Sequence, residues 1–491
     1  MQQGKPFVIS VPFKLISVLL SGICFYMGFS LEGNMGWLIW IAPIPVLYTS
    51  LHVKPGQAFV LAFMAYLIGR LSWLPYLLRL LPPVLVIVFT VILPLIFALI
   101  VIASRKMILL SQDWISVLAF PVYFTAFEYL LFVLSRDGTA ASIAYTQSNY
   151  LPVIQIASVT GILGISFLIS FFPSAIALAW YFKKNRKMVF ILTGLLIIIF
   201  SDLFIYGWLR LKKPETGNSM LIGMATIDEK AYKGVYQHEP GKEMQLTDLY
   251  LKEISGLADR GAKVILIPEK AVVVNDSSID SVLNLFKQLA LNRRIQIIIG
   301  GTRNQDGYYL NNAWFVSDQG NILADYQKVN LFEGEVMDGC KPGNKIAVFS
   351  QDSMNIGLAI CKDMDFQQFI LGYSKKSPAI LYVPAWDFVT DGWMHARMAI
   401  LRSVEGGFSL ARNARQGRLT LSDWRGKVLY EANSESGNTT TLIGKLSVGP
   451  HPTTYARAGD WFGTVNVFAA FGLLIFTFKN RKRNLKRPIH I

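Results

Sequence analysis

The first 210 residues consist of long apolar stretches separated by short polar or basic segments. Each stretch approaches the roughly 20 residues that a helix needs to cross the hydrocarbon core of a bilayer. We expect the first stretch to be a membrane span rather than a cleaved signal peptide, because further spans follow it. The pattern predicts seven transmembrane helices, over residues 11–29, 34–50, 57–78, 83–104, 114–134, 161–182 and 188–208, and an eighth over 461–478.

Between the seventh and eighth predicted spans, short β-like runs alternate with amphipathic helical stretches. The helical pattern covers 242–258, 279–293 and 392–405, and the strand pattern covers 221–227, 263–269, 296–300, 307–317, 321–327, 346–350, 355–360, 379–384, 408–412, 418–423 and 427–430. Alternating units of this size predict a layered α/β domain whose site lies at strand ends. We therefore expect a membrane domain over 1–210, an α/β domain over 211–455, and a final span with a basic tail over 456–491.

Composition and charge agree with a membrane protein. The chain has 491 residues, of which 53% are hydrophobic and only 16% charged, more apolar than a soluble protein of this size needs. The net charge of +15 gathers beside apolar stretches at 105–106, 183–187 and 479–487. Such clusters mark cytoplasmic helix ends and attract anionic lipid, so they do not predict a nucleic-acid site. They place both termini in the cytoplasm and the α/β domain outside it.

Three reactive side chains close predicted strands: Glu269, Lys328 and Cys361. A glutamate can serve as general base, a cysteine as nucleophile and a lysine as a fixed cation for an oxyanion. Each residue taken singly has a structural explanation, because strand ends are often charged and lone cysteines usually pack like small hydrophobes. Together they form a complete set for covalent catalysis. The sequence shows no metal-ligand cluster and no phosphate-binding glycine loop, so we expect no cofactor.

The order Glu, Lys, Cys between seven spans and a final span resembles the nitrilase (carbon–nitrogen hydrolase) superfamily, and in particular its membrane-embedded apolipoprotein N-acyltransferase family. Residues 144–167, which read AYTQSNYLPVIQIASVTGILGISF, are similar to the membrane-domain signature of that family. Ala385-Trp386 and residues 395–405 also resemble segments that follow the family's cysteine. The resemblance implies an outer domain built as an α-β-β-α sandwich.

The resemblance also implies a catalytic triad of Glu269, Lys328 and Cys361. The family has a second glutamate after its lysine, and Phe332-Glu-Gly-Glu335 favours Glu335 over Glu333 for this position. Glu335 would orient Lys328 or the acceptor amine, although a loop carboxylate without a catalytic role is an equally good interpretation.

The implied reaction moves a fatty acyl chain from a membrane phospholipid, through a cysteine thioester, to the N-terminal α-amine of S-diacylglyceryl-cysteine in apolipoproteins. The implied partners are therefore the phospholipid donor, the diacylated lipoprotein acceptor and membrane lipid. The implied location is the bacterial cytoplasmic (inner) membrane, with a multi-pass monomer whose catalytic domain faces the periplasm. Trp386, Phe388 and Trp393 are candidates to line the lipid access path, and each of them also fits core packing.

The sequence departs from the family pattern at several positions. Cys361 is followed by Lys362-Asp363 in place of Tyr-Glu, and Asp137–Ala140 replaces an expected Gly-Phe-Pro-Trp. Lys362 could lower the pKa of the neighbouring thiol or point to solvent. Further departures are Thr226-Ile-Asp228, Val383-Pro384 and the segment from Arg412 to Arg415.

These departures leave the acceptor open, and with it two alternative functions. One is a membrane-tethered amidase or nitrilase that acts on a small C–N substrate. The other is a catalytically idle homologue that binds lipid or lipoprotein.

Overall fold

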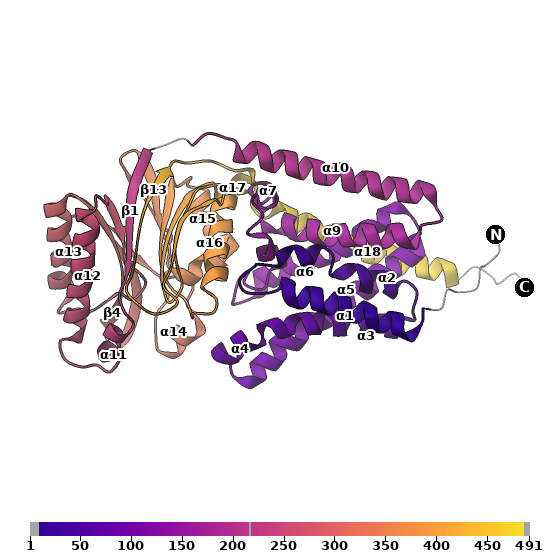
Figure 1. Ribbon diagram of the computed structural model, residues 1–491, viewed down its shortest axis with the longest axis horizontal. Coiled ribbons are helices and arrows are strands. Elements are labelled where there is room, and N and C mark those ends of the chain that lie inside the picture. The colour runs from indigo at the N-terminus through magenta and orange to yellow at the C-terminus, as the bar shows by residue number, and fades with distance from the viewer. Residues whose placement is uncertain (1–8, 216–217, 486–491) are drawn as a thin grey trace, which may run out of the picture. The chain divides into compact units, whose positions relative to one another are not determined.

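The computed structural model describes residues 9–215 and 218–485, with side chains described as far as Lys479 (Figure 1). The predicted cytoplasmic N-terminus and the end of the predicted basic tail lie outside the described residues. The chain forms two compact units. The first unit, called the membrane unit, comprises the chain up to Ser135, Ala141–Leu209 and the segment from Asp460 onward. The second, called the catalytic unit, comprises Arg136–Ala140 and Arg210–Gly459.

In the described part of the membrane unit and its last helix, seven helical segments are long and apolar enough to cross a membrane. An α-helix pairs its backbone N–H and C=O groups internally, as a bilayer requires. The segments are Val11–Gly28 (α1), Pro55–Leu80 (α3 Pro55–Arg70 continued through α4 Leu74–Leu80), Pro83–Ser111 (α5), Trp114–Leu134 (including α6 Ala119–Leu134), Ile162–Tyr181 (α9), Arg186–Leu211 (α10) and Trp461–Lys479 within α18 (Trp461–Leu485).

The predicted span at 34–50 differs from the expectation. These residues form a short 3₁₀ helix, η1 (Gly36–Trp40), and a separate α-helix, α2 (Pro43–Ser50). The apolar segment Gly36–Ser50 is therefore shorter than the seven helical segments given above. Pro43 lacks the N–H that would continue the preceding turn and instead starts α2. Among the described residues, seven helical segments are long and apolar enough to cross a membrane, and the residues of the predicted second span form the shorter apolar segment Gly36–Ser50.

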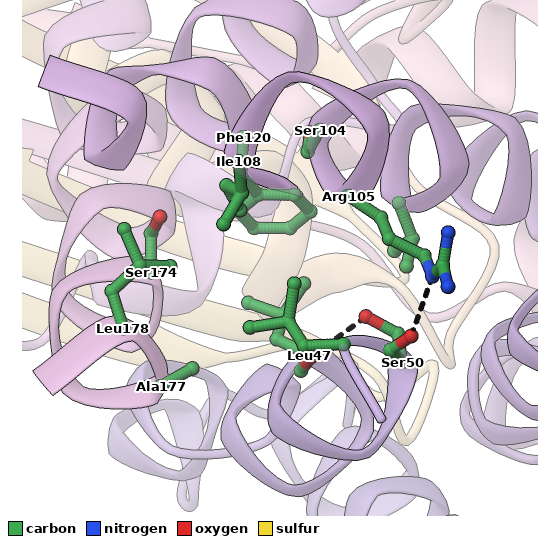
Figure 2. Close-up of a pocket in the computed structure, with 11 residues that line it drawn as sticks. Leu47, Ser50, Ser104, Arg105, Ile108, Phe120, Ser174, Ala177 and Leu178 are labelled. Carbon is green, nitrogen blue, oxygen red and sulfur yellow. Dashed lines mark hydrogen bonds between the residues drawn. The ribbon is translucent and has the colours of Figure 1, made fainter. Parts of the chain in front are cut away.

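A small cavity in the membrane unit lies between α2, α5, α6 and α9, where Arg105 meets the end of α2 (Figure 2). The Arg105 guanidinium donates from Nε to the carbonyl of Ser50 and from Nη2 to the carbonyl of Val53, both over 2.7 Å. The last carbonyls of a helix have no partner inside it, so a cation at this end is stabilising. This arginine from a predicted basic cluster thus closes the C-terminal end of α2.

The catalytic unit contains two β-sheets. The first has the order β13-β1-β2-β4-β5-β6, with β3 paired to β4. The second has the order β12-β11-β10-β9-β8-β7. The strands of the first sheet are β1 (Asn218–Thr226), β2 (Val264–Leu266), β3 (Val272–Asn275), β4 (Gln296–Gln305), β5 (Tyr308–Val316), β6 (Ile322–Gln327) and β13 (Thr440–Val448). Those of the second are β7 (Ala347–Gln351), β8 (Met354–Leu358), β9 (Ile380–Trp386), β10 (Ser409–Arg415), β11 (Arg418–Ser422) and β12 (Val428–Asn433).

The two sheets pack face to face and helices cover their outer faces (Figure 1). Apolar side chains such as Leu266, Phe315, Leu358 and Tyr382 fill the core between the sheets. The first sheet is covered by α11 (Lys230–Tyr236), α12 (Lys242–Asp259) and α13 (Ile279–Arg293), and the second by α15 (Gln367–Ser374) and α16 (Gly392–Gly406). The predicted α-β-β-α sandwich is therefore confirmed.

Several elements of the catalytic unit were not predicted from the sequence pattern, among them β3, β13, α11, α14 (Glu333–Met337) and α15. The strand β13 matters most for the fold, because it pairs antiparallel with β1 over the full register from Asn218↔Val448 to Thr226↔Thr440. It therefore extends the first sheet with the last strand of the catalytic unit.

Candidate active site

The carboxylates of Glu269 and Glu335 both bind the ammonium of Lys328. Lys328 Nζ donates to Glu269 Oε1 over 2.8 Å and to Glu335 Oε2 over 2.7 Å. Glu269 follows β2, Lys328 directly follows β6, and Glu335 lies on α14. All three side chains are buried, and Glu335 rather than the exposed Glu333 faces the lysine. The structure thus brings together three of the four residues chosen from the sequence.

Asn311, on β5, links the two carboxylates and was not predicted as a site residue. Its Nδ2 donates to Glu269 Oε1 and to Glu335 Oε1, each over 2.6 Å. Its carbonyl accepts from the backbone N–H of Lys328 over 2.8 Å. Two consecutive asparagines in the middle of an apolar strand are the signal that was available in the sequence, because buried amides are expected to have hydrogen-bond partners.

Lys270 is a second cation at this cluster and was also not predicted. Its Nζ lies 3.1 Å from Glu335 Oε1. The same ammonium lies 5.3 Å from the ring centroid of Tyr309 and 5.7 Å from that of Trp386, within the range of cation–π attraction. The cluster therefore contains two carboxylates and two ammonium groups.

Cys361 lies three residues beyond the end of β8, as the first residue of the 3₁₀ helix η5 (Cys361–Asp365). Its backbone has a φ of +42°, in the left-handed region that side chains other than glycine rarely adopt. The thiol donates to the carbonyl of Trp386 over 3.5 Å. A half-buried cysteine on a strained turn after a strand is suited to nucleophilic attack.

The charges of Glu269 and Lys328 both act on this thiol. Burial raises the pKa of Cys361 well above its usual value, Glu269 raises it further, and Lys328 lowers it. Burial lowers the pKa of Lys328, but the carboxylates of Glu269 and Glu335 more than offset this and hold it well above its usual value. The resting site therefore combines a neutral thiol with a permanently charged lysine, so the thiol needs a base in order to react.

Asp363 anchors η5 from inside the catalytic unit. Its Oδ2 accepts from the Tyr326 hydroxyl over 2.6 Å and from the N–H of Ile360 over 3.0 Å. Its Oδ1 accepts from the backbone N–H and the Nδ2 of Asn330, over 2.9 and 3.0 Å. The carboxylate that replaces the family's glutamate thus fixes the turn that carries Cys361.

Lys362 forms an ion pair with Asp137, with Nζ and Oδ1 separated by 2.6 Å. Of the two interpretations of Lys362 from the sequence, the structure therefore supports neither a solvated side chain nor one directed at the thiol. Asp137 and Lys362 are both positions at which the sequence departs from the family pattern.

Further charged residues that depart from the family pattern lie along β9 and β10. Arg412 donates to both carboxylate oxygens of Asp387, over 2.9 and 2.5 Å, and this pair is almost completely buried. Arg415 pairs with Glu229 and stacks on Trp386, whose ring centroid lies 4.2 Å from the guanidinium carbon. These pairs hold the segment that contains the acceptor carbonyl for Cys361.

The three aromatic residues proposed for the lipid path have different surroundings. Trp386 stacks nearly parallel on Tyr236, with ring centroids 6.1 Å apart. Phe388 is partly exposed and packs on Phe332 at 5.1 Å. Trp393 lies on α16 with the Arg397 guanidinium 5.3 Å from its ring. Phe388 and Tyr236 therefore offer exposed apolar surface around this part of the unit, whereas Trp393 carries an interaction with a charged neighbour.

Within the described residues, no group of three or more His, Cys, Asp or Glu side chains is arranged to hold a metal ion. The three cysteines Cys24, Cys340 and Cys361 are free.

Comparison with protein families gives two consecutive matches. Residues 21–175 match the apolipoprotein N-acyltransferase N-terminal domain, and residues 193–418 match carbon-nitrogen hydrolase. Together the matched segments include Glu269, Lys328, Glu335 and Cys361 as well as the membrane-domain signature at 144–167.

Similar proteins include apolipoprotein N-acyltransferases and amidases. Apolipoprotein N-acyltransferase from Geobacter metallireducens is 24% identical, with 95% of each chain covered. The enzyme of the same name from Thermotoga maritima is 24% identical over 96% of this chain and 95% of its own. Deaminated glutathione amidase from Synechocystis sp. is 26% identical over 38% of this chain and 81% of its own. Among solved structures, an amidase from Nesterenkonia sp. aligns with a TM-score of 0.40 and 20% identity, over 47% of this chain and 92% of that chain.

The amidase from Synechocystis sp. matches only 38% of this chain, whereas these two acyltransferases match 95% and 96% of it. The N-terminal family match covers apolar helices of the membrane unit, which a small amidase domain does not account for. This chain therefore belongs to the apolipoprotein N-acyltransferases, membrane-embedded enzymes of the nitrilase superfamily.

Proposed function

We propose that this enzyme moves an acyl chain from a membrane phospholipid to the N-terminal α-amine of S-diacylglyceryl-cysteine in apolipoproteins. The observation that carries the proposal is the buried cluster of Glu269, Lys328 and Glu335 beside a cysteine with left-handed backbone. Such a cluster supplies a base, a fixed cation and a nucleophile, which an idle binding protein has no need to maintain.

In the first step Glu269 takes the thiol proton of Cys361, and the thiolate attacks the ester carbonyl of the phospholipid. We assign the proton to Oε2 of Glu269, because Oε1 already accepts hydrogen bonds from Lys328 and Asn311. The ester C–O bond then breaks, Glu269 returns the proton to the leaving oxygen, and lysophospholipid departs. A thioester remains on Cys361.

Lys328 stabilises the oxyanion of the tetrahedral intermediate. An ammonium has three N–H donors, and two of those on Lys328 bind Glu269 and Glu335. The third is the donor that we assign to the oxyanion, together with the backbone N–H of Lys362. Glu335 keeps the ammonium oriented, because its Oε2 accepts a hydrogen bond from Nζ over 2.7 Å.

In the second step the α-amine attacks the thioester carbonyl and loses a proton to Glu269. The C–S bond breaks, the thiolate of Cys361 recovers the proton, and an amide is formed. A thioester retains the acyl energy of the donor, and a site that excludes water favours the amine over hydrolysis. Exposed apolar residues such as Phe388 and Tyr236 would contact the lipid substrates.

The catalytic unit would lie on the outer face of the bacterial cytoplasmic membrane, with both chain termini inside. The basic clusters at 105–106, 183–187 and 479–487 support this orientation, since such clusters remain in the cytoplasm. The orientation requires that the short segment Gly36–Ser50 completes a crossing between α1 and α3. We further propose that the enzyme acts as a monomer.

The test is to incubate the purified full-length protein in detergent with phosphatidylethanolamine and to measure acyl adducts by mass spectrometry. We expect an adduct on Cys361 that is lost on addition of a diacylated lipopeptide, with a matching triacylated product. The variant Cys361→Ala serves as control and should form no adduct.

Two other results would contradict the proposal. An adduct that yields only free fatty acid would indicate a lipid hydrolase. The absence of any adduct, combined with release of ammonia from small amides, would indicate an amidase.

A further inference from the structure

Five residues between α6 and the next helical turn of the membrane unit, Arg136–Ala140, belong to the catalytic unit. We call this segment the strap. Thr139 donates twice to the carbonyl of Asp365, over 2.9 Å from its backbone N–H and over 2.7 Å from Oγ1. Both donors are buried, and Asp365 is the last residue of η5. The strap is therefore bound to one end of the turn that begins with Cys361.

A further contact of the strap is the ion pair between Asp137 and Lys362. Lys362 Nζ and Asp137 Oδ1 are 2.6 Å apart, and the Lys362 side chain is 11% exposed whereas that of Asp137 is 54% exposed. The Lys362 ammonium also lies 5.6 Å from the ring of Phe332. A lysine that has lost most of its water in this way needs its carboxylate partner more than a surface lysine does.

Gly138 makes the close approach between these two contacts possible. Its φ is +54°, and a Cβ at this position would lie 2.4 Å from the carbonyl oxygen of Asp365. Only glycine fits this backbone conformation and spacing without strain. The three consecutive residues Asp137, Gly138 and Thr139 thus form one matched surface for η5.

The strap and Asp363 fix η5 through different sets of contacts. Asp363 binds Tyr326, Asn330 and Ile360, while the strap binds the flanking residues Lys362 and Asp365. The left-handed backbone of Cys361 is costly and persists only where its surroundings fix it. Its neighbour Lys362 supplies the proposed oxyanion donor, whose direction depends on that same backbone conformation.

We propose that Asp137 and Thr139 are positioning residues for the acylation of Cys361. By fixing Lys362 and Asp365, they hold the thiol and the N–H of Lys362 in the geometry that the tetrahedral intermediate requires. The proposal rests on the proposed function, since it assigns a role in that reaction. It also explains two departures from the family pattern together, because Lys362, beside the cysteine, pairs with Asp137 in the strap.

The experiment compares Asp137→Asn, Thr139→Val and the charge-reversed pair Asp137→Lys/Lys362→Asp with the full-length protein. Asp248→Asn, at an exposed carboxylate on α12, is the matched control. The acylation rate of Cys361 is measured at several concentrations of phosphatidylethanolamine, together with thermal unfolding.

We expect Asp137→Asn and Thr139→Val to slow acylation at saturating lipid about fivefold to tenfold, with the half-saturating concentration changed less than twofold. Thr139→Ser retains the hydroxyl donor and should restore the rate, as should the charge-reversed pair. Asp248→Asn should behave as the unaltered protein. Unchanged acylation in Asp137→Asn, or a charge-reversed pair as slow as Asp137→Asn, would overturn the proposal.

Two measurements keep this test independent of acyl transfer. Hydrogen exchange of the backbone amides of 361–366 should accelerate in Asp137→Asn, and iodoacetamide should alkylate Cys361 at least about threefold faster, because a loosened turn exposes the thiol. If the unaltered protein forms no acyl adduct, the proposed function fails while these readouts still test the strap. Exchange and alkylation rates equal to those of the unaltered protein would reject the strap's role in either case.

Discussion

The ammonium of Lys328 lies 2.7 Å from Oε2 of Glu335, and both side chains are almost completely buried. Burial alone would raise the pKa of Glu335, but Lys328 and Lys270 lower it below its usual value. The carboxylate therefore stays charged and keeps the lysine oriented. Because Glu269 and Lys270 complete the cluster, its four charges balance, and loss of any one leaves a buried charge without compensation.

Glu335→Gln removes one of these charges while keeping the shape of the side chain. We expect acylation of Cys361 to slow at least about tenfold and the free energy of unfolding to fall by about 3 kcal/mol. Since the pKa of Glu335 is lowered by folding, its stabilising contribution is complete above the ordinary value of 4.5 and declines as the pH falls below it. Rate measurements and chemical denaturation at several pH values check both effects.

The matched control for this change is Glu333→Gln, at the exposed carboxylate two residues earlier on α14. Glu333→Gln should change the acylation rate by no more than about twofold and the free energy of unfolding by no more than about 0.5 kcal/mol. Equal effects of the two substitutions would show that Glu335 has no special role.

Asn311→Leu removes the amide that donates to both Glu269 and Glu335. We expect acylation to slow by about two orders of magnitude, because both carboxylates lose a buried donor and the base loses its orientation. The neighbouring Asn312 donates to Asp325 instead. Asn312→Leu should therefore destabilise the fold to a similar extent in denaturation experiments yet leave the acylation rate of the folded protein within about threefold. A similar loss of rate in both variants would argue against the assigned role of Asn311.

Glu269→Gln removes the proposed base and makes the reaction depend on the thiolate of Cys361. At pH 7 we expect acylation to slow by about 10²–10⁴-fold. Burial is the main reason that the pKa of Cys361 is raised, so few thiolates exist at neutral pH in this variant. The residual rate should therefore rise by about tenfold per pH unit up to at least pH 9. A rate that levels off below pH 7 would contradict the raised pKa.

Asp363→Ala removes a carboxylate that accepts from Tyr326, Ile360 and Asn330. We expect the free energy of unfolding of the catalytic unit to fall by about 3 kcal/mol, since buried donors lose their acceptor. Asp259→Ala breaks an exposed pair with Arg293 and should cost no more than about 1 kcal/mol. Urea denaturation of the two variants side by side provides the comparison, and equal losses would rule out Asp363 as an anchor.

Labelling of single cysteines tests the proposed orientation in the membrane. In a background in which Cys24, Cys340 and Cys361 are all replaced by alanine, Lys345→Cys places the single thiol at an exposed position of the catalytic unit, and Lys184→Cys places it between α9 and α10. A maleimide that does not cross membranes should label Lys345→Cys in intact spheroplasts and Lys184→Cys only after permeabilisation. The opposite pattern would place the catalytic unit in the cytoplasm.

Most of the fold could be predicted from the sequence because its signals are local. Apolar stretches near 20 residues define membrane helices through the cost of burying polar groups in lipid, and strand runs such as 355–360 end where polar residues begin. One exception is local in origin and the other is not. Residues 34–50 are apolar enough for a span, but Pro43 divides them into two shorter helices. The strand β13 escaped prediction because its partner β1 lies more than 200 residues away in the chain.

From the sequence alone, Glu269, Lys328 and Cys361 could be recognised at strand ends, and the resemblance to the nitrilases added Glu335. The side chains that complete the site could be identified only in the folded chain, because hydrogen bonds form between residues that are close in space rather than in sequence. Asn311 joins two carboxylates from a third strand, and Asp137 reaches Lys362 from 225 residues away. No partner for Lys362, beside the nucleophile, could be identified from the sequence. In the folded chain its Nζ lies 2.6 Å from Oδ1 of Asp137.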